Sequence, residues 1–211
     1  MSVRKGRNWG EPGSLSAGSP VVGTDAEVVA ATSDAIAAGA IPDVGLVGGD
    51  LHRTLGSPRR TEGDLRAGRG IRYPIDLAEA VLTRDDGSTH RAVFCAHLLA
   101  VEGDRTLFGA RTVAVMNAAF RASDNLGPRA HPGDGLLDLT DGRLGWWDRW
   151  QARRRLATGT HVPHPDLSVR RSRCFEIAFT RPATVVLDGV DHGPASAVWI
   201  GCLPDAIVVV A

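Results

Sequence analysis

The residues that could do chemistry in this sequence are carboxylates that stand beside or just after glycine. Glycine lets backbone amides approach phosphate oxygens closely, a hard cation takes carboxylate oxygens as ligands, and a carboxylate can accept a proton from a hydroxyl within hydrogen-bond reach. Each pattern also has a purely structural interpretation, because Asp-Gly is a common hairpin turn and a helix start needs a polar cap. The candidates are Asp25 after Gly23-Thr24, Asp50 after Gly49, Asp134 between Gly133 and Gly135, and Asp188 before Gly189.

A histidine pair, His161 and His164, has Asp166 nearby, and all three are ligand types that zinc accepts. Pro163 and Pro165 make this segment extended rather than helical, so the two imidazoles need not converge. The sequence therefore does not favour a zinc site here.

Composition bounds the class of protein. The 211 residues include 24 Lys+Arg and 24 Asp+Glu, and this balance argues against a nucleic-acid binder, which is usually basic. The three cysteines are too few and too irregularly spaced for a disulfide framework, which favours a reducing, cytoplasmic location. Contact with a membrane surface remains open.

The amino-terminal part predicts a piece of an α/β layer. Residues 1–20 are rich in Gly, Ser and Pro and predict a flexible arm. Thr24 and Glu27 form a capping box, which predicts a helix that stops at Gly39. Residues 44–47 then predict a short strand, and a helical turn follows before a polar junction.

Beyond this junction, at residues 61–70, the pattern becomes strand-like. Residues 77–83 and 91–100 flank Asp86-Gly87, which is a strong hairpin signal. Many short strands separated by turns predict a sandwich or a curled sheet. We expect an α+β chain with a β-rich, sandwich-like carboxyl-terminal domain and a short partial α/β piece at the amino end. The further predicted strands cover residues 106–117, 136–139, 174–180, 184–187, 195–200 and 206–210.

One helix is predicted among these strands, at residues 143–157. Trp146 and Trp150 share a face, and arginines follow at 153–155. A basic helix with aromatic residues suits a membrane surface, and it equally suits a helix that packs its Trp face on a sheet. Packing on the sheet is the default interpretation.

The carboxyl-terminal part resembles the diacylglycerol kinase-type family of bacterial lipid kinases. Four segments match its motifs in the same order and with similar spacing: Gly-Pro-Arg-Ala-His-Pro-Gly-Asp-Gly-Leu-Leu-Asp-Leu at 127–139, Gly-Thr-His at 159–161, Val-Val-Leu-Asp-Gly at 185–189 and Pro-Asp-Ala-Ile-Val-Val at 204–209. The resemblance is firmest over residues 134–211, and we expect the β-rich domain to span 69–211.

The amino-terminal part resembles the same family in a degenerate form. Residues 49–56 keep Asp50, Arg53, Leu55 and Gly56 of a motif that has Gly-Thr-x-Asn before its Asp. Upstream, Gly-Thr-Asp-Ala at 23–26 stands where the family has Gly-Gly-Asp-Gly-Thr. We expect residues 21–68 to be the truncated remnant of a nucleotide-binding domain.

The resemblance assigns roles to individual residues. It implies that Asp188 is the base that takes the proton of the attacking lipid hydroxyl, although Val190 replaces the Glu that follows in the family. It implies a structural magnesium at Asp134. It also implies nucleotide contacts from Gly23, Thr24, Asp25 and Asp50, with ATP and magnesium as cofactors.

Two functions follow from this resemblance. The first is a divergent lipid kinase-like protein of lipid metabolism whose ATP site is degenerate and whose catalysis is impaired, and which keeps a lipid or a phosphorylated small molecule as ligand. The alternative is an active ATP-dependent lipid kinase that completes its nucleotide site by forming a homo-oligomer. A structural or interaction protein without a ligand is a third interpretation.

Overall fold

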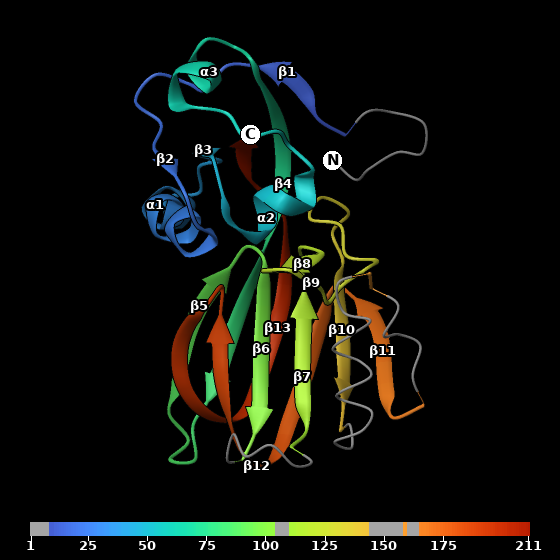
Figure 1. Cartoon of the computed structure of the whole chain (residues 1–211). Coiled ribbons are helices and arrows are strands. Elements are labelled where there is room, and N and C mark those ends of the chain that lie inside the picture. Colours follow the sequence, from blue (N-terminus) through green and yellow to red (C-terminus); the bar gives the residue numbers. More distant parts are fainter. Residues whose placement is uncertain (1–8, 104–109, 144–157, 160–164) are drawn as a thin grey trace.

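The computed structural model describes residues 9–103, 110–143, 158–159 and 165–211 (Figure 1). It is β-rich, as predicted: among the described residues, one large sheet carries the helices α1, α2 and α3 at one end of its long strands. The helices are α1 (Asp25–Ala37), α2 (Gly49–Leu55) and α3 (Glu62–Arg66). The strands are β1 (Glu11–Gly13), β2 (Val21–Val22), β3 (Asp43–Leu46), β4 (Gly70–Thr83), β5 (Thr89–Phe94), β6 (His97–Glu102), β7 (Thr112–Met116), β8 (Phe120–Arg121), β9 (Asp124–Asn125), β10 (Leu137–Gly142), β11 (Leu167–Ser172), β12 (Cys174–Leu187) and β13 (Val190–Val210).

The capping box that predicted the first helix is present at the start of α1. The Thr24 side chain accepts a hydrogen bond from the Glu27 amide, and the Glu27 carboxylate accepts one from the Thr24 amide. Strand β2 lies before α1 and pairs in parallel with β3, so this part is a small α/β layer as expected. A second capping box, from Thr61 and Asp64, starts α3 inside the segment that was predicted to be a polar junction.

Two long strands connect this layer to the rest of the molecule. Strand β13 pairs with β4 along most of its length, and its last residues also pair in parallel with β3. The C-terminus consequently lies among the amino-terminal elements (Figure 1). A single hydrogen-bonded sheet thus runs through both parts of the chain, across the predicted boundary between residues 68 and 69.

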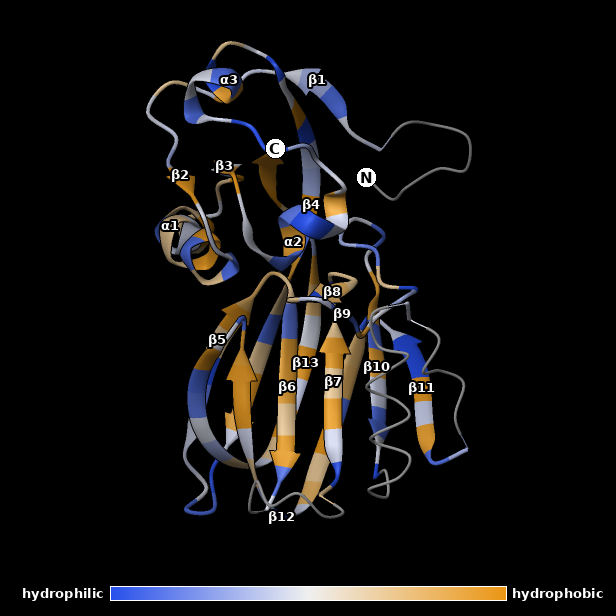
Figure 2. Cartoon of the chain, viewed as in Figure 1, coloured by the Kyte–Doolittle hydropathy of each residue, from blue (hydrophilic) through white to orange (hydrophobic). Residues whose placement is uncertain are grey.

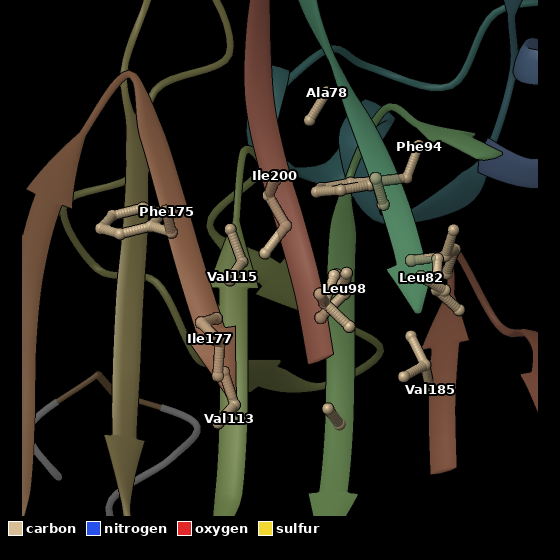
Figure 3. Close-up of a cluster of buried hydrophobic side chains, with 14 of the residues drawn as sticks. Ala78, Leu82, Phe94, Leu98, Val113, Val115, Phe175, Ile177, Val185 and Ile200 are labelled. Carbon is tan, nitrogen blue, oxygen red and sulfur yellow. The ribbon is translucent and has the colours of Figure 1, made fainter. Parts of the chain in front are cut away.

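The lower part is a curled sheet whose strands follow the order β5-β4-β13-β12-β6-β7-β10-β11. Side chains from β4, β5, β12 and β13 meet those of β6, β7 and β10 in one apolar core, which is the sandwich-like arrangement that the sequence predicted (Figure 3). Alternating polar and apolar residues along these strands mark the inner and outer faces (Figure 2). Core residues include Leu82, Phe94, Leu98, Val115 and Ile200.

Several predicted elements need correction. The flexible arm is ordered where it is described: β1 pairs with β4, Leu15 is 4% exposed, and Trp9 packs against Tyr73. The predicted strand at 91–100 is two strands, β5 and β6, because the chain bends at Cys95–Ala96. Conversely, the last four predicted strands are the two continuous strands β12 and β13, each kept together across a bulge.

Some predictions lie outside the described residues: the helix at 143–157, except Arg143, and the histidines of the zinc pair, His161 and His164. Within the described residues, no helix has the length and apolar character that crossing a membrane requires.

Candidate functional site

Asp188 lies in the turn between β12 and β13, with a positive φ of 46°. Its carboxylate accepts hydrogen bonds from three consecutive backbone amides, those of Cys95, Ala96 and His97, at 2.7, 3.0 and 2.9 Å. Its own amide donates to the His97 carbonyl at 3.0 Å. Asp188 is therefore a turn residue that also holds the bend between β5 and β6, and its oxygens are already engaged by backbone donors.

Asp25 is buried at the start of α1, and its carboxylate faces the start of α2. It accepts hydrogen bonds from the amides of Asp50 and Leu51, at 2.7 and 3.1 Å. The N-cap residue of α2 is Gly48, which has no side chain to do this. One helix thus caps the other through a carboxylate.

The glycines before α2 permit this approach. A Cβ on Gly49 would lie 2.6 Å from the Asp25 Oδ1 atom, and a Cβ on Gly48 would lie 2.6 Å from the Gly23 carbonyl. Gly49 also has a φ of 91°, which is strained for residues with a side chain. In this chain the space beside Gly49 is filled by the protein's own Asp25 carboxylate.

The amides at the predicted phosphate loop are engaged in a similar way. Glu27 accepts hydrogen bonds from the backbone amides of Gly23 and Thr24, at 2.9 and 3.1 Å. These are amides that the resemblance implied for phosphate contact. In this structure the exposed Glu27 carboxylate of the capping box accepts hydrogen bonds from both of them.

A histidine that the sequence did not single out completes the group. His97, whose side chain is 4% exposed, places Nε2 3.0 Å from the Asp50 Oδ2 atom. The other Asp50 oxygen accepts a hydrogen bond from the Ala122 amide at 2.6 Å. The signal for His97 could not be local, because it lies in an ordinary strand and its partner is 47 residues away.

Burial acts to raise the pKa of each carboxyl of this site. Burial raises the pKa of Asp25 to about 6, and the charges of Asp188 and Asp50 add to the rise against the opposing amide bonds. Burial also raises the pKa of Asp188, although its amide bonds oppose the shift. Burial would do the same for Asp50, but the hydrogen bond with His97 holds the pKa of that carboxyl below its ordinary value. In turn, burial acts to lower the pKa of His97, and the bond with Asp50 raises it overall.

Asp134 contacts a different set of residues, before β10. Its carboxylate accepts a hydrogen bond from the Leu136 amide at 3.0 Å and pairs with the Arg171 guanidinium. No three Asp, Glu, His or Cys side chains in the described ranges are grouped so that they could hold a metal ion. The structure thus brings Asp25, Asp50 and Asp188 together and leaves Asp134 elsewhere, where its carboxylate is bound to an arginine.

Comparisons with known proteins agree with this fold. The family model of the YegS C-terminal NAD kinase beta sandwich-like domain matches residues 89–211, which is more than half of the chain. No curated protein matches the sequence.

Among solved structures, one of a diacylglycerol kinase from Bacillus anthracis str. Sterne matches with 14% identity and a TM-score of 0.62, covering 90% of this chain and 75% of that chain. A second, of a protein assigned as a diacylglycerol kinase from the same organism, matches with 15% identity and a TM-score of 0.65, covering 90% of this chain and 76% of that one. At this identity the likeness shows the shared fold.

Replacing Asp25 by Asn is expected to remove a pH dependence of stability. Because folding raises the pKa of this carboxyl from 3.8 to about 6, its stabilising contribution is complete at low pH and is lost as the pH rises through about 6. The difference in unfolding free energy between wild type and Asp25→Asn should therefore change by about 2 kcal/mol between roughly pH 4.5 and pH 7.5. Urea unfolding at both pH values measures it, with Asp34→Asn, on the exposed side of the same helix, as the control for removing one negative charge. A constant difference would contradict the assignment.

Replacing Asp188 by Asn tests its structural role. Asn tolerates the positive φ, but its NH₂ group cannot accept, so at least one of the three amides loses its partner. We expect the unfolding free energy to fall by about 1–3 kcal/mol. Asp86→Asn is the matched control, because Asp86 also precedes a glycine in a turn but lies exposed and accepts hydrogen bonds from its close neighbour Ser88. If both substitutions lowered the unfolding free energy equally, the hydrogen bonds from the amides of Cys95–His97 to Asp188 would add no stability beyond that of an ordinary turn.

Proposed function

This chain belongs to the family of the YegS C-terminal NAD kinase beta sandwich-like domain, and we propose that it is a diacylglycerol kinase-like protein whose phosphoryl transfer from ATP is impaired. We further propose that it keeps a lipid or a phosphorylated small molecule as its ligand. One observation supports the proposed impairment. At each motif that was predicted to bind phosphate, carboxylates of the protein itself accept the hydrogen bonds of the backbone amides or lie against the glycine.

Three pairings support this proposal. Glu27 holds the amides of Gly23 and Thr24, Asp25 holds those at the start of α2, and Asp188 is held by the amides of 95–97. A phosphate oxygen and a carboxylate oxygen compete for the same donors. A general base also needs an oxygen directed at the substrate hydroxyl, whereas those of Asp188 accept from the backbone.

The negative charge of these residues also supports an impaired use of ATP. A nucleoside triphosphate at this place would approach Asp25, Glu27, Asp50 and Asp188, which are all carboxylates. Like charges in a partly buried site repel one another; in the protein alone, burial is the main cause of the raised pKa of Asp25, and the charges of Asp188 and Asp50 add to the rise. The residues present here therefore do not fit a triphosphate, and no step of a reaction is derived through ATP or magnesium.

The lipid side of the proposal is supported by the part of the chain that the family model covers. Residues 89–211 include β6, β7, β10, β12 and β13, and the buried apolar side chains of these strands belong to one core. The Bacillus structures that share this fold are assigned to enzymes acting on diacylglycerol. A lipid ligand would also bring the protein to a membrane surface.

Phosphoryl transfer tests the impairment. Purified protein mixed with Mg-ATP labelled at the γ-phosphate and diacylglycerol should transfer no label above a protein-free blank, and calorimetric titration with Mg-ATP should show no saturable binding. An active diacylglycerol kinase assayed in parallel is the positive control. Transfer that disappears in Asp188→Asn would overturn the proposal and establish the alternative, an active kinase. Gel filtration with and without Mg-ATP would then show whether a homo-oligomer forms.

Lipid binding is tested separately, because it does not depend on catalysis. We expect the protein to sediment with phosphatidylcholine vesicles that contain diacylglycerol more than with vesicles of phosphatidylcholine alone. Organic extraction of freshly purified protein, followed by mass spectrometry, should release a co-purified lipid or a phosphorylated metabolite. Absence of both vesicle retention and extracted ligand would contradict this half of the proposal and favour a ligand-free interaction protein.

A further inference from the structure

A group of buried carboxylates lies around the start of β10, away from the site described above. Asp138 is 5% exposed and Asp76 is 1% exposed. Asp76 is fully engaged, since its two oxygens accept hydrogen bonds from the amides of Gly135 and Asp205, at 2.6 and 2.9 Å. Both oxygens of Asp138, in contrast, are buried without a hydrogen-bond donor among the described residues.

These carboxylates need a positive charge. The side chains of Asp134 and Asp138 are 20% and 7% exposed, so both carboxylates lie in a poorly solvated place. A carboxylate removed from water without a donor or a counter-charge is strongly destabilising. Some cation must therefore compensate Asp134 and Asp138 in the folded protein.

Arg171 is placed to do this. It is the direct cross-strand neighbour of Asp138 in the β10–β11 pair. Its guanidinium pairs with the Asp134 carboxylate, and its Nε atom lies 3.7 Å from the Asp138 Oδ1 atom. Arg129 and His131 also act on these carboxyls through their charge, but within the described residues only Arg171 forms ion pairs with them.

Magnesium could not occupy the same place together with this side chain. It requires oxygen ligands at about 2.0–2.1 Å in near-octahedral geometry and repels a neighbouring guanidinium. Asp134, for which the family resemblance implies a structural magnesium, is instead bound by Arg171. We infer that Arg171 is a built-in counter-cation that replaces a structural metal ion here and makes the fold independent of divalent cations.

Thermal unfolding of the full chain tests this inference. The wild-type melting temperature should be the same in EDTA and in MgCl₂ at matched ionic strength. Arg171→Ala in EDTA should melt about 5–10 °C lower, because it leaves two carboxylates uncompensated. Adding about 10 mM MgCl₂ should restore about 3–5 °C to this variant, since a cation that binds only the folded state stabilises it.

Three controls make the result specific to this place. Arg171→Lys keeps the charge and should stay insensitive to magnesium. Arg170→Ala, on the same strand but set over the Phe175 ring, should also show no magnesium response. The double variant Arg171→Ala/Asp138→Asn should lose the response of the single variant, because a neutral amide then replaces one of the two carboxylates that would attract the cation.

The inference is overturned if EDTA lowers or magnesium raises the melting temperature of the wild type. It is equally overturned if Arg171→Ala gains no stability from magnesium. Should that variant fail to fold in both conditions, the wild-type comparison and Arg171→Lys decide the question alone. Neither outcome depends on phosphoryl transfer or on lipid binding, so this inference and the proposed function can fail separately.

Discussion

The region where the helices meet the long strands depends on one constraint: backbone amides that secondary structure leaves without a partner need another acceptor. The ladder is interrupted between β5 and β6, and α1 and α2 each begin with free N–H groups, as every helix does. In all three places a side-chain carboxylate supplies the acceptor: Asp188 at the bend, Glu27 before α1, and Asp25 at α2. The bend and the start of α2 can be buried because acidic side chains accept hydrogen bonds from their amides, whereas Glu27 and the amides before α1 are exposed.

The same bonds join elements that are distant in sequence. Asp188 ties the β12–β13 turn to the corner before β6, and Asp25 ties α1 to α2. The contact between Asp50 and His97 then joins α2 to β6. Asp25, Asp50 and Asp188, for which the resemblance implied contacts with nucleotide or substrate, thus join distant elements here, and a similar fold with similar motifs need not imply similar chemistry.

Local signals in the sequence predicted local structure well. The capping box of Thr24 and Glu27 and the hairpin turn at Asp86-Gly87 involve residues within four positions of one another, so their pattern is visible without the fold. Contacts between residues that are far apart in the sequence produce no such local pattern. The amides that bind Asp188 are more than 90 residues away, and Arg171 meets Asp138 only because two strands pair in one register. The pairing of residues 11–13 with β4 could not be predicted either, because the partner strand is distant in sequence. Glycine and proline in that segment also gave no strand pattern.

The placement of the last residues of β13 bears on how the protein is made. Residues 208–210 fill the gap between β3 and β4, and they are the only described strand residues that pair with β3 on that side. During synthesis, α1 and β3 leave the ribosome well before β13 does, so their apolar faces stay uncovered until β13 has been made. Such delayed pairing exposes an open strand edge, which favours binding by chaperones and pairing with a wrong strand. Slow or interrupted translation between β3 and β13 would thus harm the amino-terminal layer first.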